Sequence, residues 1–214
     1  MRQLVIDTAT EALSVALFTD GELTDFHHEI AGRGHAEKLI PIIAKMDNGG
    51  RADSIIVDSG PGSFTGVRVG LAAARALAYG WNVPLQGYDS LTLLAAMARA
   101  SVDGTVTDPA SELAVAITGG HGELFWRLFD PDTLAPQMEL RSTPISLLAE
   151  ELKTPVVYGS GAAALIDARG YGRAVPLHPD ARHVPLMPKD ALRDDMAPIY
   201  GRGADAVPLA ARKG

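Results

Sequence analysis

The stretch from Asp58 to Gly70 reads Asp-Ser-Gly-Pro-Gly-Ser-Phe-Thr-Gly-Val-Arg-Val-Gly, and the interpretation of the chain starts from it. It follows the apolar run 54–58 and leads into a helical pattern over 67–79, an order typical of α/β proteins. Glycines let the backbone turn sharply or approach another group closely, and the first N–H groups of a helix attract anions. The loop is therefore either an anion-binding site or a tight turn. It is not a Walker A loop, because no Gly-Lys-Ser/Thr ends it.

Seven residues of this loop are candidate site residues. Ser63 and Thr65 carry hydroxyls that can cap the helix or bind an anion. Phe64 is unexpected in a simple turn, because an aromatic ring at the apex of a loop indicates that another group packs on it. The full set is Gly60, Gly62, Ser63, Phe64, Thr65, Gly66 and Arg68.

Apolar periodicity on both sides of the loop divides the chain into two halves. In the first half we expect strands over 3–8, 13–19, 22–30, 54–58 and 83–88, and helices over 35–46, 67–79 and 91–99. In the second half we expect strands over 112–118, 123–129, 134–140 and 155–158, and helices over 144–152 and 162–168. Each half begins strand, strand, strand, helix, strand, helix. This order predicts two domains, 1–102 and 103–214, the second ending in a proline-rich tail that wraps over the surface and whose last residues are loose.

Composition excludes several classes of function. The 214 residues carry 19 Lys and Arg against 26 Asp and Glu, a formal net charge of −7, so tight nucleic-acid binding by this chain alone is not expected. The absence of cysteine excludes a disulfide framework, cysteine-type zinc sites and thiol catalysis. No apolar run approaches the ~20 residues that span a bilayer, and the opening residues do not read as a signal peptide. We expect a cytoplasmic globular protein with no membrane partner.

Four segments together resemble the TsaB family, the dimerisation subunit of the bacterial machinery that makes threonylcarbamoyladenosine in tRNA. The glycine loop, GPGSFTGVRVG at 60–70, is close to the family's signature. The opening VIDTATEALSVAL at 5–17 is similar to its first motif, and Gly34–Leu39 followed by Pro41 to its His-x-Glu-x-Leu-x-Pro helix start. Pro198-Ile199-Tyr200 with Ala204-Asp205-Ala206 resembles its C-terminal element.

The resemblance implies a fold and a role. The fold would be α/β, with duplicated actin/Hsc70/sugar-kinase-like (ribonuclease H-like) domains whose mixed sheets are flanked by helices. The chain would be a catalytically silent paralogue of TsaD, which transfers a threonylcarbamoyl group to adenosine 37 of tRNAs reading codons that begin with A. It would bind TsaD, with the P-loop ATPase TsaE joining them, form a homodimer in isolation and meet tRNA only through the complex. ATP and metal would be held by the partner subunits.

A vestigial nucleotide site is expected from the same resemblance. Asp7 ends the first strand at a position that in the superfamily lies near phosphate and magnesium; the alternative is that Asp7 and Thr8 cap the hairpin. Gly159 and Gly161 resemble the turn that holds adenosine in kinase relatives, although any strand-to-helix turn reads similarly. We expect no nucleotide cofactor bound by this chain alone.

No metal site is expected. Catalytic relatives bind metal through two histidines four residues apart on a helix. Here His35 has only Glu37 nearby, and residues i and i+2 of a helix do not share a face. His35 is instead expected to be a cap or an interface group. The family's old glycoprotease (peptidase M22) label is disfavoured, because no His-x-x-x-His or His-Glu-x-x-His pattern is present.

The helices on either side of the glycine loop are the expected partner interface. The second carries small residues every four positions, Gly70, Ala74 and Ala78, and such a strip lets another helix approach closely. The alternative is that the same residues pack on the chain's own sheet. The expected interface consists of His35, Glu37, Leu39, Ile42, Ile43, Met46, Gly70, Ala74 and Ala78.

The sequence thus predicts a non-catalytic scaffold subunit with no catalytic residues of its own. The first rival is a small-molecule phosphotransferase of the same superfamily, which would transfer or hydrolyse nucleotide phosphate by itself. The second is the disfavoured metalloprotease.

Overall fold

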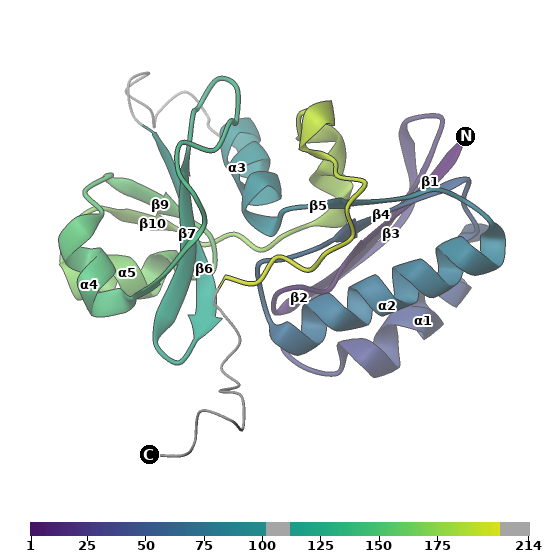
Figure 1. Cartoon of the computed structure of the whole chain (residues 1–214), viewed down its shortest axis with the longest axis horizontal. Helices are drawn as coiled ribbons and strands as arrows, with labels where there is room; N and C mark the ends of the chain where they lie inside the picture. The colour runs from purple at the N-terminus through teal and green to yellow at the C-terminus, as the bar shows by residue number, and fades with distance from the viewer. Residues whose placement is uncertain (102–111, 202–214) are drawn as a thin grey trace, which may run out of the picture.

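The computed structural model describes residues 1–101 and 112–201, and these form two five-stranded sheets with helices on their outer faces (Figure 1). The first sheet has the order β3-β2-β1-β4-β5, in which β1 pairs antiparallel with β2 and parallel with β4. Its strands are β1 (Arg2–Asp7), β2 (Ala12–Thr19), β3 (Glu22–Ile30), β4 (Ser54–Asp58) and β5 (Leu85–Tyr88). Its helices are α1 (His35–Lys45), α2 (Phe64–Trp81) and α3 (Ser90–Ser101), with a 3-10 turn, η1 (Asp47–Gly50), after α1.

The second sheet repeats this topology. Its order is β10-β9-β6-β7-β8, so β6 and β7 take the places of β1 and β2, and β9 and β10 those of β4 and β5. Its elements are β6 (Leu113–Gly120), β7 (Glu123–Phe129), β8 (Arg141–Pro144), α4 (Ile145–Glu151), β9 (Val156–Tyr158), α5 (Ala162–Arg169) and β10 (Arg173–Val175). The matching strand order confirms the predicted α/β fold of duplicated actin-like halves. The division between 102 and 103 lies outside the described residues and stays a prediction.

The predicted strand over 134–140 is wrong, and the third strand of the second half lies further on, at β8. Pro136 has no N–H to donate and makes only an isolated bridge to Phe129, and Leu134 takes a positive φ of 60°. Arg141 begins the true strand, where it pairs with Trp126 and lays its guanidinium over the indole ring. The short strand β10 was not predicted, because its three residues carry too little periodicity.

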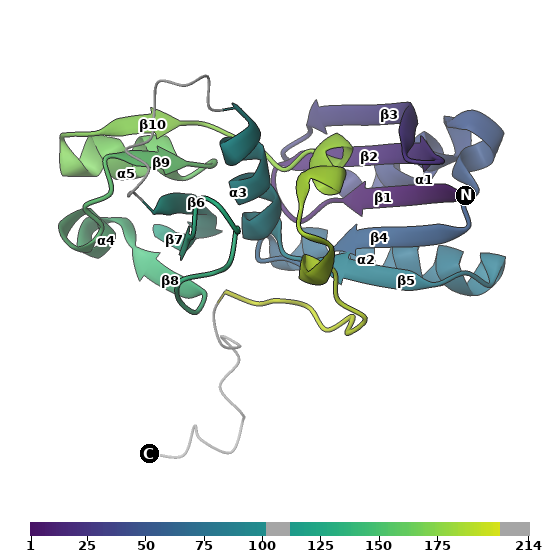
Figure 2. The same ribbon diagram turned by 90° about the horizontal axis from the view of Figure 1, so that it is seen from above.

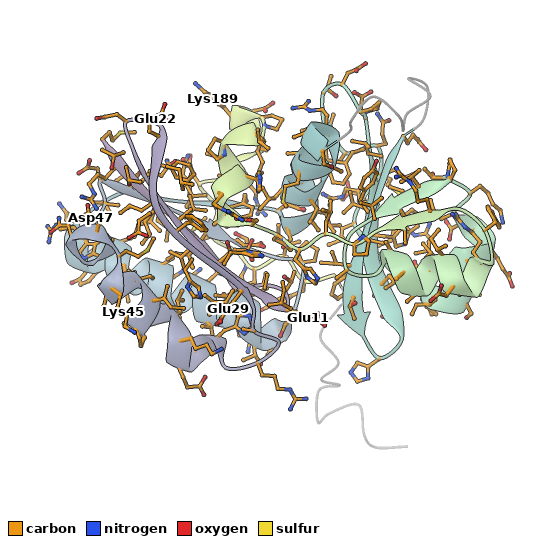
Figure 3. The ribbon with its side chains drawn as sticks, turned by 180° about the vertical axis from the view of Figure 1, so that it is seen from behind. Glu11, Glu22, Glu29, Lys45, Asp47 and Lys189 are labelled. Atoms are coloured by element: carbon orange, nitrogen blue, oxygen red, sulfur yellow. The ribbon has the colours of Figure 1, made fainter. Side chains whose placement is uncertain are left out.

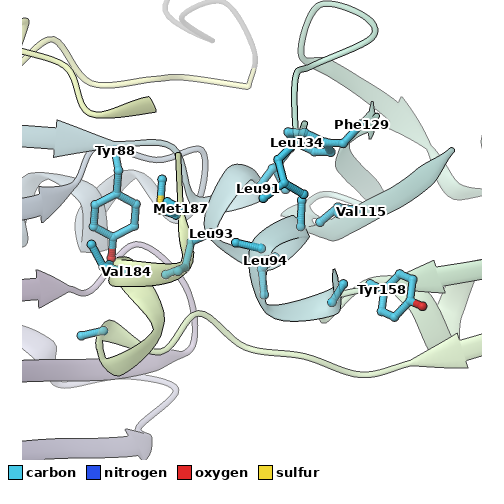
Figure 4. Packing of buried hydrophobic residues seen from close by; sticks show 14 of the residues in the cluster. Tyr88, Leu91, Leu93, Leu94, Val115, Phe129, Leu134, Tyr158, Val184 and Met187 are labelled. Atoms are coloured by element: carbon cyan, nitrogen blue, oxygen red, sulfur yellow. The ribbon is translucent and has the colours of Figure 1, made fainter. Parts of the chain in front are cut away.

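The two halves share one core. The outer face of the first sheet packs on α1 and α2, and that of the second on α4 and α5. The facing surfaces of both sheets pack on α3, which is buried on every side (Figures 2 and 4). A helix that is apolar all round belongs in a protein interior, and α3 therefore joins the two sheets rather than covering one.

The tail does more than wrap over the surface. It forms two 3-10 turns, η2 (Ala181–Leu186) and η3 (Lys189–Ala191), and η2 buries Ala181 and Val184 between α3 and the first sheet. The following segment, Arg193–Tyr200, runs along the first half, and we call it the strap (yellow in Figure 1). It begins with paired hydrogen bonds between Arg193 and Gly87, at the open edge of β5. The final residues predicted to be loose lie outside the described part of the chain.

Charged side chains are distributed unevenly over the first half. Figure 3 shows several at the periphery, including Glu22 on β3 and Lys45 and Asp47 at the end of α1. Lys38 of α1 binds Glu29 of β3 at 3.0 Å, which ties the helix to the strand. By contrast, α2 contains no acidic residue, and its charges are Arg68 and Arg75. This helix is thus a basic element in an acidic chain.

Candidate functional site

The glycine loop joins β4 to the N-terminus of α2, as predicted. Ser63 caps the helix, its Oγ accepting the Gly66 N–H at 3.4 Å. Gly60 has a φ of +98°, a conformation that a side chain disfavours. Gly62 and Gly66 have no such φ, so the reason for glycine there must be space.

The connection between β1 and β2 occupies that space. A Cβ on Gly62 would lie 2.1 Å from the carbonyl oxygen of Ala9, and one on Gly66 would lie 2.1 Å from that of Thr8. The Ser63 N–H donates to Ala9 at 2.6 Å, and the Thr8 hydroxyl donates to the Gly66 carbonyl at 2.8 Å. The loop closes around the chain's own backbone: the Ser63 and Gly66 N–H groups bind protein oxygens, and the space beside Gly62 and Gly66 is filled. Of the two interpretations left open by the sequence, the geometry matches the tight turn.

A pair of buried carboxyl groups lies behind the loop. Asp7 and Asp58 end neighbouring parallel strands, are both almost fully buried, and lie close enough for the charge of one to affect the other. Tyr88 donates its hydroxyl to Asp7 at 2.6 Å, and the Ser90 hydroxyl lies 2.6 and 2.8 Å from the two oxygens of Asp58. The Gly60 N–H also donates to Asp58, at 2.6 Å. The pair therefore links the glycine loop to the start of α3.

Burial sets the protonation of this pair. Loss of water raises the pKa of both carboxyl groups, and repulsion from Asp7 raises the pKa of Asp58 further, to well above its ordinary value. Two carboxyl groups buried side by side resist being charged together, so one of them keeps its proton. Burial also raises the pKa of the Tyr88 hydroxyl, which keeps it a donor. Asp7 is enclosed by protein groups, as the capping alternative required, rather than open to a phosphate or a cation.

The second-half turn is equally closed. A Cβ on Gly159 would lie 2.3 Å from the Ala116 carbonyl oxygen, and one on Gly161 would lie 2.6 Å from the Leu124 side chain. Both glycines therefore serve close packing of the turn on β6 and β7. Both parts of the expected vestigial nucleotide site are therefore packed against the chain's own backbone and side chains.

The predicted interface residues fall into two groups. Most are buried in the chain's own core and do not form an exposed surface: His35, Leu39, Ile43, Met46, Gly70, Ala74 and Ala78. This corrects the prediction of an outward strip at 70, 74 and 78. A Cβ on Gly70 would lie 2.5 Å from Thr8 Oγ1, and Ala74 and Ala78 pack toward the sheet. His35, likewise buried, places Nε2 3.1 Å from the Ala12 carbonyl oxygen. Glu37 is exposed and Ile42 half-buried.

A second small-residue row on α2 is the one that faces outward. Ala72 and Ala76 are exposed, Val69, Ala73 and Leu77 beside them are partly exposed, and Tyr79 is 92% exposed. The neighbouring helix α1 exposes Ile40. Small and apolar exposed side chains on adjacent helices form a surface that another helix pair can approach closely.

The start of α2 carries an exposed aromatic stack that includes the strap. The rings of Phe64 and Tyr200 lie 5.5 Å apart at an interplanar angle of 28°. Arg68 stacks its guanidinium 3.4 Å from the centre of the Phe64 ring and donates from Nε to the Tyr200 hydroxyl at 3.1 Å. The sequence indicated that something packs on Phe64. It did not identify Tyr200, whose only signal was the Pro198-Ile199-Tyr200 motif.

The sequence also did not predict that Asp58, Tyr88 and Ser90 form a group around Asp7. Asp58 was quoted as the first residue of the loop, but nothing in its spacing indicated that it meets Asp7. Among the described residues, no group of three or more His, Cys, Asp or Glu is placed to hold a metal ion, and no helix is long and apolar enough to cross a membrane.

Comparisons with known proteins give names that all concern the threonylcarbamoyl modification of tRNA. Residues 26–131 match the family described as TsaD, tRNA N6-adenosine threonylcarbamoyltransferase. The chain is 35% identical over 137 residues to the tRNA threonylcarbamoyladenosine biosynthesis protein TsaB of Escherichia coli, covering 62% of this chain and 56% of that protein. It is 42% identical over 128 residues to TsaB of Haemophilus influenzae, covering 58% and 51%. The chain thus matches about half the length of these curated relatives.

Solved structures agree with the fold. A structure of YeaZ from Pseudomonas aeruginosa superposes with a TM-score of 0.69 at 25% identity, covering 86% of this chain and 88% of that one. A second, of an uncharacterized protein with similarity to peptidase YEAZ from the same organism, gives 0.67 at 27% identity, covering 84% and 86%.

Proposed function

We propose, from the premise that this chain belongs to the TsaB family, that it is a non-catalytic subunit of the complex that makes threonylcarbamoyladenosine in tRNA. Its partner would be a TsaD-type subunit that transfers the threonylcarbamoyl group to adenosine 37 of tRNAs reading codons that begin with A. A TsaE-type ATPase would join the complex in the cytoplasm. The tRNA, ATP and metal would be held mainly by the partners, and the isolated chain would pair with a second copy.

The observation that carries the proposal is the closed glycine loop. In a phosphotransferase of this fold the loop amides would have to face a phosphate, whereas here Thr8 and Ala9 occupy the space beside Gly62 and Gly66. The buried pair Asp7–Asp58 is likewise satisfied by protein groups. These features support a subunit that docks on a partner, rather than a phosphotransferase.

The docking surface of this proposal is the exposed face of α1 and α2. It comprises Ile40, Val69, Ala72, Ala73, Ala76 and Leu77. It replaces the strip at Gly70, Ala74 and Ala78, which lies inside the core. Its three alanines, Ala72, Ala73 and Ala76, lie on α2, so the backbone of a partner helix can come close to this helix.

The experiment is association of the purified chain with a purified TsaD-type protein. Ala72→Arg and Ala76→Arg place long charged side chains on the exposed row, and we expect each to weaken binding at least tenfold, because burying an unpaired charge costs several kcal/mol and ~1.4 kcal/mol is tenfold in Kd. Ala163→Arg, at an exposed alanine of α5 in the other half, is the matched control and should bind normally. A folded Ala72→Arg, Ala76→Arg double variant with unchanged affinity would refute the proposed surface.

A further inference from the structure

Among residues 1–101 and 112–201, Arg68 has no acidic side chain as a salt-bridge partner. Five arginines of the described chain lie over aromatic rings, namely Arg68, Arg127, Arg141, Arg169 and Arg182. Three of them bind a carboxylate as well, Arg127 to Asp89, Arg141 to Glu151 and Arg182 to Asp180. Arg169 donates to two backbone carbonyls. Within the described residues, Arg68 forms no salt bridge, and its hydrogen bond is from Nε to the neutral Tyr200 hydroxyl at 3.1 Å.

The surroundings hold this guanidinium in place. Phe64 stacks on it from the same helix, one turn earlier, and Tyr200 fixes Nε from the strap. The strap is itself anchored, because Arg75 donates to the Met196 carbonyl at 2.7 Å and the Ile199 N–H donates to Ser59 at 2.7 Å. Within the part of the chain that the structure describes, the two terminal nitrogens of Arg68 have no hydrogen-bond partner and can bind a new group. A pre-positioned pair of terminal N–H donors suits a planar carboxylate, which it can bind through two hydrogen bonds.

The two aromatic rings of the stack are exposed to water, which forgoes the free energy that their burial would contribute. Phe64 is 55% and Tyr200 44% exposed, so two rings that could have been buried remain at the surface beside a charge. Arginine and tyrosine are enriched among the residues that dominate protein–protein binding, whereas isolated exposed rings need no explanation. Here the exposed rings and the unpaired charge occur together.

The stack is also continuous with the proposed docking surface. Residues 64, 68, 72 and 76 follow one another at the four-residue spacing of a helix face, so Arg68 begins the exposed row that Ala72 and Ala76 continue. The strap adds Tyr200 to that row from a position far along the chain. A partner lying on the row would meet the stack at the N-terminal end of α2.

We propose that the Phe64–Arg68–Tyr200 stack is an anchor for a carboxylate of the protein partner that docks on α2. This rests on the proposed function, and it adds the strap to the interface and assigns the partner an Asp or Glu opposite Arg68. Charge complementarity supports an acidic contact, since α2 offers Arg68 and Arg75 and no acid of its own. The Tyr200 hydroxyl is a positioning group, because it orients Arg68.

Binding of the same TsaD-type protein tests this anchor. Arg68→Gln should weaken Kd about tenfold, and Arg68→Glu more, because it places like charges together. Tyr200→Phe keeps the ring and removes the hydrogen bond, so it should weaken binding less than Arg68→Gln. Raising the salt concentration should weaken the binding of the wild type more than the binding of Arg68→Gln, because salt screens an ion pair that the variant lacks. A purely structural role of Arg68 would not produce this difference. Circular dichroism and melting temperature establish that each variant is folded.

Arg169 and Tyr171 supply the matched control. Tyr171 is 48% exposed and Arg169 lies over its ring at 4.3 Å, in the second half and away from α2. Tyr171→Ala should leave affinity unchanged. If folded Arg68→Gln and Arg68→Glu bind like the wild type while Ala72→Arg does not, the anchor is refuted and the docking surface stands. If Ala72→Arg also binds normally, the docking surface fails together with the anchor. The proposed function itself fails only if the wild-type chain does not bind the TsaD-type protein.

Two further outcomes would overturn the anchor by assigning it another occupant. Arg68→Gln could abolish only self-association, measured by sedimentation, which would make the occupant a second copy of this chain. It could instead reduce only the retention of tRNA by the assembled complex, which would make the occupant a phosphate or base. In both cases the affinity for the TsaD-type protein would be unchanged.

Discussion

At the residue scale, the buried acid pair predicts a pH dependence of stability. A folded pKa raised above the unfolded value means that the native state holds a proton which the unfolded state has released. The free energy of unfolding should therefore fall as pH rises above the ordinary aspartate value of 3.8, by at most about 1.4 kcal/mol per pH unit per proton. Asp58→Asn replaces the shared proton with an N–H donor, so we expect a flatter curve in chemical denaturation between pH 5 and 8.

The control for this prediction is Asp130, which is exposed and whose pKa is lowered by hydrogen bonds from Thr133. Its contribution is lost when pH falls, so Asp130→Asn should alter only the acid side of the curve. An Asp58→Asn variant with the same slope as the wild type between pH 5 and 8 would show that the pair does not hold a proton.

The glycine loop gives a second residue-scale prediction. Gly66→Val would press a branched side chain against the Thr8 carbonyl oxygen, 2.1 Å from the new Cβ, and should destabilise the protein by about 3 kcal/mol. Ser63→Ala removes a long cap hydrogen bond of 3.4 Å and should cost about 1 kcal/mol or less. Thermal unfolding measures both. Equal melting temperatures for Gly66→Val and the wild type would mean that the loop can move away from the hairpin.

At the element scale, the sequence predicted the helices and most strands but not which side of α2 faces inward. Two rows of small residues run along this helix, 70–74–78 and 72–76–80, and both have the spacing of a helix interface. Only the three-dimensional packing distinguishes them, because Gly70 packs against Thr8 in the connection between β1 and β2. The sequence also did not predict that Asp7 meets Asp58 or that Arg68 meets Tyr200. Each contact joins residues far apart in sequence, so only the three-dimensional structure shows it.

The two rows predict opposite behaviour. Ala74 is fully buried, so Ala74→Arg should prevent folding, because the core offers no partner for the charge. Ala72→Arg on the exposed row should keep the melting temperature within a few degrees. Circular dichroism at 25 °C compares the two. A folded Ala74→Arg beside an unfolded Ala72→Arg would reverse the orientation of α2.

At the scale of the whole molecule, α3 makes the halves depend on each other. Leu91, Leu93 and Leu94 are all fully buried on this helix and contact apolar residues of both sheets (Figure 4). η2 adds Val184 and Met187 to the same core from the tail. Two domains joined by a flexible linker would unfold independently, whereas one continuous core predicts a single cooperative transition.

The chain's two tryptophans make this testable, because Trp81 ends α2 in the first half and Trp126 lies in β7 of the second. Trp81→Phe and Trp126→Phe each leave one reporter, and the two fluorescence transitions in urea should have the same midpoint. In both backgrounds Leu94→Ala should lower the free energy of unfolding by about 2–5 kcal/mol, while Leu147→Ala, exposed on α4, should change it by less than about 0.5 kcal/mol. If Leu94→Ala separates the two midpoints, the halves are independent domains. If the midpoints move together, any partner that binds α2 also stabilises the second sheet, since ligand binding to one part of a cooperative unit stabilises all of it.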